Sequence, residues 1–219
     1  MRQLNVILED LKDRGILVGP GHFVLGDGYG NPGFHSRMFI HWGLFAEAVD
    51  IYAELVHHLA KQISHVHFDC IIATDEDSLP TARMLARVHS EEVCRPPVEC
   101  FSRESGLPTA KKPQTALLHD DFINNGRQAN DTLIVLAQTQ CKPVAISTLF
   151  TRTEGLELFS LPIYSAVGEA MVAYPPDDLP VDLLATPINT QYGKGDIYLR
   201  REAEALAGGL RRAANSRLS

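Results

Sequence analysis

One stretch, residues 115–128, constrains the fold of this chain more than any other. It begins with a short apolar run at 115–118, which is typical of a buried strand. Two adjacent carboxylates, Asp120 and Asp121, follow at the expected end of that strand. The turn-forming residues at 124–126 come next, and residues of these types tolerate positive φ. The pattern predicts a strand that delivers an acidic pair to a tight turn.

Behind the turn, apolar residues recur at helical spacing: Ala129, Leu133, Leu136 and Ala137. In an open α/β sheet, ligands bind beyond the carboxyl ends of the strands, and a helix N-terminus with unpaired N–H groups can hold a phosphate. Asp120 and Asp121 could then hold ribose hydroxyls or Mg²⁺, a hard cation that prefers oxygen ligands. The alternative is a strand-to-helix turn in which the acidic pair only caps the helix.

This stretch resembles the phosphoribosyl-diphosphate (PRPP) binding motif of the type I phosphoribosyltransferases, in which an apolar strand runs into two acids, two apolar residues and a turn around a glycine. The matching residues are Asp120, Asp121, Phe122, Ile123 and Gly126. The resemblance implies that Asp120 and Asp121 are catalytic and hold the ribose or a metal ion. It also implies that the turn binds the 5′-phosphate, through Asn124, Asn125, Gly126, Arg127 and Gln128. The two asparagines stand where Thr or Ser is usual.

The N-terminal third resembles the hood of the orotate phosphoribosyltransferases, in which a first helix ends in a Gly-Ala/Ile-Leu segment and a Gly-x-Phe-x-Leu segment follows. The matching residues are Gly15, Ile16, Leu17, Gly21, Phe23, Leu25 and the run 34–39. In that family the hood contacts the orotate ring, so the resemblance implies that Phe34 or Phe39 contacts the base. Asp27-Gly28 replaces the usual Ser-Gly, which leaves the identity of the base open.

An apolar run at 68–73 predicts a central strand that ends in the acidic loop Asp75, Glu76 and Asp77. By the same resemblance this loop is the pyrophosphate loop, and Leu79-Pro80 matches the apolar-Pro pair that follows it. Three carboxylates repel a diphosphate unless metal ions bridge them. The loop therefore binds Mg²⁺, with Asp75 and Asp77 as ligands, or binds something else, or has lost that role. Alternatively, its acids only suit the N-terminus of the next helix.

The strand expected at 97–103 ends in Phe101-Ser102-Arg103, which resembles the Phe-Val-Arg that precedes the mobile catalytic loop of the family. That loop supplies lysines and a histidine, whereas here Glu104 replaces the usual lysine and no histidine lies between 105 and 114. The cations that the resemblance assigns to catalysis are Arg103, Lys111 and Lys112. A lid this short predicts weak sequestration of the reaction from water.

The other elements follow from the periodicity of apolar residues. Helices are expected at 4–11, 44–63, 127–140 and from 202 onward, strands at 34–42, 143–150 and 158–163, and an extended tail at 174–188. The strand at 158–163 contains Pro162, which favours an edge position. The histidines at 57, 58, 65 and 67 suggest either a metal cluster or a solvated helix face, and no acid or cysteine completes the usual metal-ligand spacing.

Composition limits the class of protein. The net charge of −7 disfavours non-specific nucleic-acid binding. No apolar run approaches the roughly 18 residues that a membrane-spanning helix needs, and the N-terminus has no signal-peptide core. Cys70 and Cys100 lie in apolar strand-like runs, which favours buried thiols over disulfides or zinc ligands. We therefore expect a cytoplasmic protein that binds neither nucleic acid nor membrane.

Alternating strands and helices predict an α/β protein, and the resemblance specifies the parallel sheet of the type I phosphoribosyltransferase fold with an N-terminal hood. We expect one domain, 1–219, divided into a hood (1–42), an α/β core (43–165) and a C-terminal tail and helix (166–219). The resemblance implies an Mg²⁺-dependent, homodimeric phosphoribosyltransferase of the orotate type, which joins ribose 5-phosphate from PRPP to a nucleobase. The alternative is a non-catalytic or regulatory homologue that binds PRPP or a nucleotide.

Overall fold

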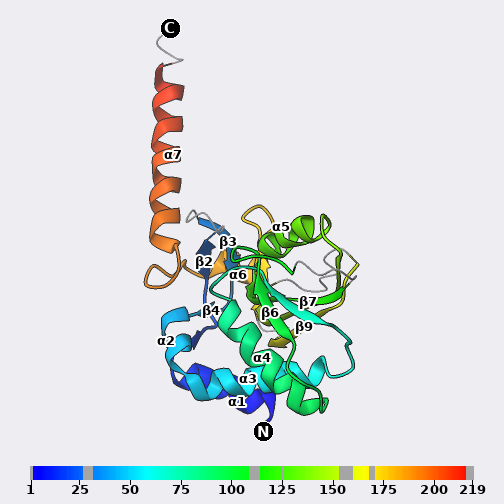
Figure 1. Ribbon diagram of the computed structural model, residues 1–219. Helices are drawn as coiled ribbons and strands as arrows, with labels where there is room; N and C mark the ends of the chain where they lie inside the picture. The colour runs from blue at the N-terminus through cyan, green and yellow to red at the C-terminus, as the bar shows by residue number, and fades with distance from the viewer. Residues whose placement is uncertain are drawn as a thin grey trace. The chain divides into compact units, whose positions relative to one another are not determined.

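The computed structural model describes residues 2–26, 32–108, 114–124, 126–152, 160–167 and 171–215 (Figure 1). The chain forms two compact units. The first comprises Met1–Ile16 and Trp42–Val172, and the second comprises Leu17–His41 and Ala173–Ser219. The division into hood, core and tail that the sequence predicts stays a prediction.

The first unit is built on a five-stranded parallel sheet in the order β6-β5-β7-β8-β9. Its strands are β5 (Cys70–Ala73), β6 (Glu99–Ser102), β7 (Gln114–Ile123), β8 (Cys141–Thr151) and β9 (Ile163–Val167). All four residues of β5 are buried, as expected for a central strand of a sheet that is covered on both faces. The α/β class predicted from the sequence is confirmed. Strand β9, which Pro162 directly precedes, is an edge strand of the sheet, as the proline predicted.

In the described part of this unit, five helices accompany the sheet: α1 (Leu4–Asp13), α2 (Trp42–Glu47), α3 (Val49–Gln62), α4 (Leu79–Glu92) and α5 (Arg127–Leu136). Helix α3 packs on α4 and contacts β8 and β9 (Figure 1). The chain passes from β5 through α4 to β6 in one direction along the sheet, and from β7 through α5 to β8 in the other. Because such crossovers are right-handed, α4 and α5 lie on opposite faces.

The buried side chains between the sheet and α5 form one hydrophobic cluster, which consists of Cys70, Ile72, Ala116, Leu118, Ile123, Ala129, Leu136, Cys141 and Ile146. Two of its members, Cys70 and Cys141, are free thiols whose sulfurs lie 3.7 Å apart. The predicted buried cysteines are thus confirmed for Cys70, whereas Cys100 is half-buried. Burial raises the pKa of the Cys70 thiol above its ordinary value.

The second unit contains short antiparallel strands. Strand β1 (Leu17–Val18) pairs with β4 (Phe39–Ile40), and a second sheet has the order β10-β3-β2, with β10 (Ala173–Tyr174), β3 (Pro32–Ser36) and β2 (Phe23–Gly26). Helices α6 (Val181–Ala185) and α7 (Gly195–Asn215) complete it. The Arg37 guanidinium ties the unit together, because its Nε donates to Asp182 at 2.6 Å and its Nη1 to the Tyr174 hydroxyl.

Several predicted boundaries were wrong. The helix expected at 44–63 is interrupted at Ala48 and forms two helices. The backbone of Ala48 is not helical (φ −86°, ψ 61°), and its N–H donates to the Phe45 carbonyl, which ends α2. The strand expected at 34–42 is likewise two short strands followed by α2, and the tail contains β10 and α6. Strand β7 continues through the acidic pair, because its ladder with β8 extends to Ile123 opposite Thr151. Residues 158–159 of the last predicted strand lie outside the described part.

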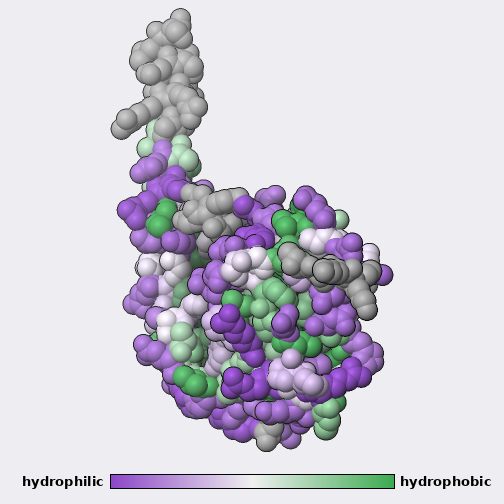
Figure 2. All heavy atoms as spheres, in the orientation of Figure 1, coloured by the Kyte–Doolittle hydropathy of each residue, from purple (hydrophilic) through white to green (hydrophobic). Residues whose placement is uncertain are grey.

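The face of the molecule in Figure 2 is a mosaic of hydrophilic and hydrophobic residues, the usual surface of a globular protein. Among the described helices, none combines the length and the apolar character needed to cross a bilayer.

Candidate active site

The topology of the sheet points to one place for a ligand. Strands β5 and β7 are neighbours, and the chain leaves them toward opposite ends of the sheet. Between the carboxyl ends of two such strands a crevice opens, which is where open α/β sheets bind ligands. The loop after β5 carries Asp75, and α5, after β7, carries Gln128. The Gln128 side-chain amide donates to Asp75 Oδ2 at 2.7 Å, so the structure brings these two predicted site residues together.

Asp120 is a buried carboxylate, 5% exposed, in β7. The Phe122 N–H donates to Asp120 Oδ1 at 3.1 Å. Burial raises the pKa of Asp120 to about 6, and the charges of Asp75 and Asp121 add to the rise. The backbone hydrogen bond from Phe122 and the field of His119 oppose it. Asp120 is therefore a carboxylate whose ionised form is costly and would be favoured by a nearby cation or hydroxyl donor.

Asp121 has a different environment from its neighbour, because successive side chains of a strand point to opposite faces. Asp121 shares its face with His119, and Asp121 Oδ1 lies 3.2 Å from His119 Nε2. The other ring nitrogen of the buried His119 lies 3.0 Å from Ser147 Oγ. Burial raises the pKa of Tyr52 to about 12, and the charge of Asp121 contributes to the rise. Sequence reasoning missed His119 and Tyr52; a histidine directly before the acidic pair was the available signal.

The predicted phosphate-binding turn leads into α5. Gly126 adopts the left-handed conformation (φ 72°), which glycine reaches without the strain of a Cβ. Helix α5 begins at Arg127, so the N–H groups of its first turn have no partner within the helix. Arg127 and Gln128 are exposed, and Asn125 lies outside the described residues. Phosphate binding at this turn stays a prediction.

The acidic loop after β5 is held by its own carboxylates. The Ser78 N–H donates to Asp75 Oδ1 at 2.8 Å, which leaves Oδ2 for Gln128. Glu76 accepts a hydrogen bond from the Ser102 hydroxyl, which lowers the pKa of Glu76 below its ordinary value. Asp77 is exposed. Asp75 thus bonds the backbone at the start of α4, and Glu76 bonds the last residue of β6. The predicted metal-binding role of the loop stays a prediction.

The other predicted site residues are distributed over the chain. Arg103 follows β6, and its Nη1 lies 3.9 Å from Asp131 Oδ2 in α5. Lys111 and Lys112 lie outside the described residues. Phe34 and Phe39 belong to the second unit, where the Phe39 ring packs on two other aromatic rings, with centroids 5.9 Å from that of Phe23 and 5.6 Å from that of Tyr192.

Sequence reasoning missed a basic residue, Arg152, which lies at the carboxyl ends of the parallel strands. It follows β8 directly and is only 5% exposed. Its guanidinium carbon lies 4.7 Å from the centroid of the Phe122 ring. Burial lowers the pKa of Arg152 to about 10, so the side chain still carries its positive charge at neutral pH. The signal in the sequence is a single arginine at the end of a long apolar run.

Known proteins resemble this chain over most of its length. No family model matches it. Orotate phosphoribosyltransferase of Parvibaculum lavamentivorans is 26% identical over 188 residues, which are 83% of this chain and 92% of that protein. The orotate phosphoribosyltransferase of Methylorubrum populi is 28% identical over 189 residues, 83% of this chain and 91% of that protein.

Solved structures agree on the fold. Orotate phosphoribosyltransferase from Francisella tularensis superimposes with a TM-score of 0.57 at 18% identity over 74% of this chain and 85% of that one. The enzyme from Aeropyrum pernix gives 0.54 at 19% identity over 76% and 94%. Adenine phosphoribosyltransferase from Thermoanaerobacter pseudethanolicus gives 0.51 at 13% identity over 74% and 99%. The fold is that of the type I phosphoribosyltransferases. Together with the curated relatives, it identifies the chain as orotate phosphoribosyltransferase-like, which confirms the resemblance read from the sequence.

Proposed function

We propose that this chain is a phosphoribosyltransferase of the orotate type, which transfers ribose 5-phosphate from PRPP to a nucleobase. The observation that carries the proposal is the placement of Asp120 and Asp121 on β7, immediately before the left-handed Gly126 and the start of α5. The relatives named orotate phosphoribosyltransferase support an enzyme over the non-catalytic alternative.

The reaction joins a base nitrogen to the anomeric carbon of PRPP, while the bond from that carbon to the diphosphate oxygen breaks and the diphosphate leaves with the electron pair. Positive charge develops on the sugar and negative charge on the leaving group, so fixed charges at this crevice stabilise the transition state. Asp120 and Asp121 would hold the ribose, and the first turn of α5 its 5′-phosphate. Of the three cations predicted to contact the departing diphosphate, Arg103 lies within the described residues.

Arg152 suits the base side of the reaction. A buried guanidinium that is still protonated at neutral pH is a ready partner for the electronegative edge of a base. Its guanidinium lies over the Phe122 ring, directly after the carboxyl end of β8. Phe34 and Phe39 stay the predicted aromatic contacts to the base.

The carboxylates of Asp75, Asp120 and Asp121 suit Mg²⁺ as ligands. Asp75 and Asp121 both raise the pKa of Asp120, so the three charges repel one another and a divalent cation would relieve the repulsion. The Thr74 hydroxyl is buried here and has no hydrogen-bond partner within the described ranges, which adds a hard oxygen. No described group of three or more His, Cys, Asp and Glu forms a metal cage. Mg²⁺ usually keeps waters and substrate oxygens, so it would arrive with PRPP and neutralise the diphosphate.

The test is a steady-state assay with orotate, PRPP and Mg²⁺. Asp120→Asn with Asp121→Asn should abolish turnover and PRPP binding, whereas the matched exposed pair Asp177→Asn with Asp178→Asn should leave both unchanged. Measurable PRPP affinity that is equal in the two double variants would contradict the site assignment. PRPP binding without turnover on any nucleobase would instead favour the regulatory alternative.

We also propose that the chain acts in the cytoplasm as a homodimer, as the family resemblance implies. Sedimentation equilibrium at micromolar concentration should give twice the chain mass of 24.2 kDa. A monomer that retains full turnover would contradict the homodimer.

A further inference from the structure

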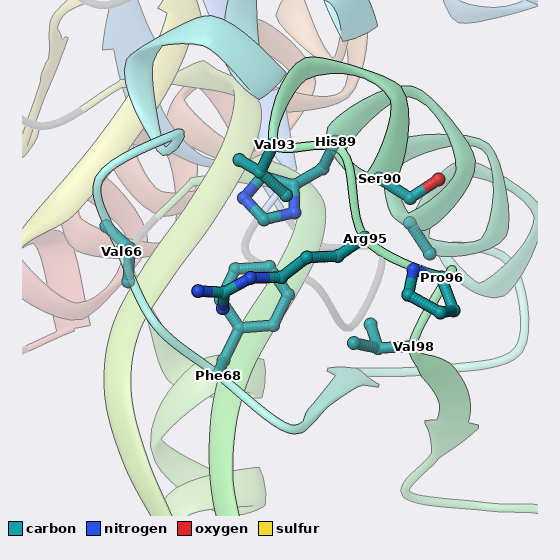
Figure 3. Close-up of a pocket in the computed structure, with 9 residues that line it drawn as sticks. Val66, Phe68, His89, Ser90, Val93, Arg95, Pro96 and Val98 are labelled. Carbon is teal, nitrogen blue, oxygen red and sulfur yellow. The ribbon is translucent and has the colours of Figure 1, made fainter.

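A small pocket lies at the amino ends of the parallel strands, at the opposite end of the sheet from the candidate active site. It is formed by the segments that precede β5 and β6 and by the last turns of α4 (Figure 3). The candidate active site lies at the carboxyl ends of these parallel strands, so this pocket at their amino ends is a separate site. Six of its nine lining residues are apolar: Val66, Phe68, Ala86, Val93, Pro96 and Val98.

One wall of the pocket carries a buried histidine with an unused nitrogen. His89 is 8% exposed, and its Nε2 has no hydrogen-bond partner among the described residues. The Ile63 carbonyl accepts a hydrogen bond from the ring. The His89 and Phe68 ring centroids lie 4.8 Å apart, so the two rings pack on each other beside Arg95 (Figure 3). A buried polar atom without a partner is costly, so Nε2 favours a ligand that shares a proton with it.

The second polar group of the pocket is Arg95, which enters from the connection between α4 and β6 (Figure 3). Its guanidinium makes a long polar contact, 3.4 Å from Nη1 to His67 Nδ1. Burial lowers the pKa of His89, and the positive fields of Arg95 and His67 add to this. An anion between Arg95 and His89 would remove that repulsion. The Ser90 hydroxyl is already committed, because it donates to the Arg87 carbonyl at 2.6 Å.

We propose that this pocket binds a short-chain carboxylate. One carboxylate oxygen accepts hydrogen bonds from the Arg95 guanidinium, and the other shares a proton with His89 Nε2. The alkyl body of the ligand lies against the apolar wall that Val66 and Val98 help to form. Arginine is the side chain best suited to a planar carboxylate, and an apolar wall rewards a methyl or ethyl group that follows it.

The size and the chemistry of the pocket argue against other ligands. Its volume is about 40 Å³, roughly the space of three water-sized groups, which holds the three heavy atoms of a carboxyl group and leaves one or two further carbons at the pocket rim. A phosphate needs donors on all sides, whereas the side chains that offer donors here are those of Arg95 and His89, with the Ser90 hydroxyl already committed. A metal ion would face the positive charge of Arg95.

The experiment is an NMR titration of the full-length protein labelled at valine methyl groups, with propionate as the probe. We expect saturable, millimolar shifts at the Val66 and Val98 methyls, as suits a ligand of so few atoms. Propionamide keeps the shape and lacks the charge, so it should bind at least tenfold more weakly. Inorganic phosphate should leave the Val66 and Val98 signals unmoved.

Variants locate the interaction. Arg95→Met and His89→Gln should each weaken propionate binding at least tenfold. Replacement of the exposed Arg87, which lies in α4 with His89, by Met should not. Thermal unfolding checks that each variant is folded, and the comparison of propionate with propionamide on the unaltered chain needs no variant. Equal affinity for propionate and propionamide, phosphate binding as tight as propionate, or unchanged affinity in folded Arg95→Met would each overturn the proposal.

Discussion

Asp120→Asn should make the protein more stable at neutral and alkaline pH while it removes activity. Asp120 is nearly inaccessible to solvent, and burial is the first cause of its raised pKa. Asparagine has almost the same shape and keeps an oxygen to accept the Phe122 N–H, but it carries no charge that must lose its hydration. The native residue therefore costs stability at a site where the proposed function requires a carboxylate.

The pKa gives the magnitude and the sign. The folded-state pKa of about 6 lies above the ordinary value of 3.8, so the folded protein binds this proton more tightly than the unfolded chain. The stability that the neutral carboxyl contributes is fully present below pH 3.8 and is lost as the pH rises through 6. The difference between the two pKa values corresponds to about 3 kcal/mol. Asp120→Asn should be more stable than the native protein by up to that amount at pH 8, and equally stable near pH 3.5.

The assay is urea unfolding at pH 8 and at the lowest pH at which the native protein remains folded, with excess chelator so that no metal ion is bound. The control is Asp177→Asn, an exposed aspartate whose replacement should change the free energy of unfolding little at either pH. A lower stability of Asp120→Asn at pH 8, or a gain that does not shrink as the pH falls, would refute the reasoning.

Three other outcomes follow from the same structure. Gly126→Ala should destabilise the protein by about 1–2 kcal/mol in urea unfolding, because its left-handed backbone disfavours a Cβ, and should raise KM for PRPP; an unchanged KM would contradict the role of the turn. If the ionised form of Asp120 holds ribose or metal, kcat/KM should fall as the pH decreases through about 6, and a flat profile from pH 5 to 8 would contradict this. Ellman's reagent should modify the exposed Cys94 quickly and spare Cys70 and Cys141, since burial raises the pKa of both thiols; peptide mapping that finds Cys70 or Cys141 modified as fast as Cys94 would contradict it.

The sequence could predict the parallel sheet because the pattern that marks it is local. Runs such as 68–73 and 143–150 are apolar without alternation, which is the signature of strands covered on both faces. Boundaries were less predictable, because they depend on partners distant in sequence. Strand β7 reaches Ile123 only because β8 supplies a matching edge up to Thr151. The break at Ala48 has no comparable signal, since neither glycine nor proline lies there.

The site could be predicted in part for the same reason. Adjacent acids before a glycine turn form a sequence motif, so Asp120 and Asp121 could be singled out directly. Arg152 and Tyr52 reach the site through tertiary folding, and no spacing in the sequence connects them to β7. For the acidic loop the metal ligands Asp75 and Asp77 stay a prediction, and the hydrogen bonds that join Asp75 to Ser78 and Gln128 appear only in the structure.

The pleat of β7 separates the roles of the two adjacent aspartates. Asp120 points to the same face as Leu118, which belongs to the apolar cluster beneath α5; this explains its burial and its raised pKa. Asp121 points to the face of His119, which can donate a hydrogen bond to it, and of Tyr52. Asp120 is thus costly to ionise, whereas Asp121 has a hydrogen-bond partner on its own face. A substrate with one ribose and one metal-bound diphosphate offers each of them a different partner, so an acidic pair on a single strand can serve two functions.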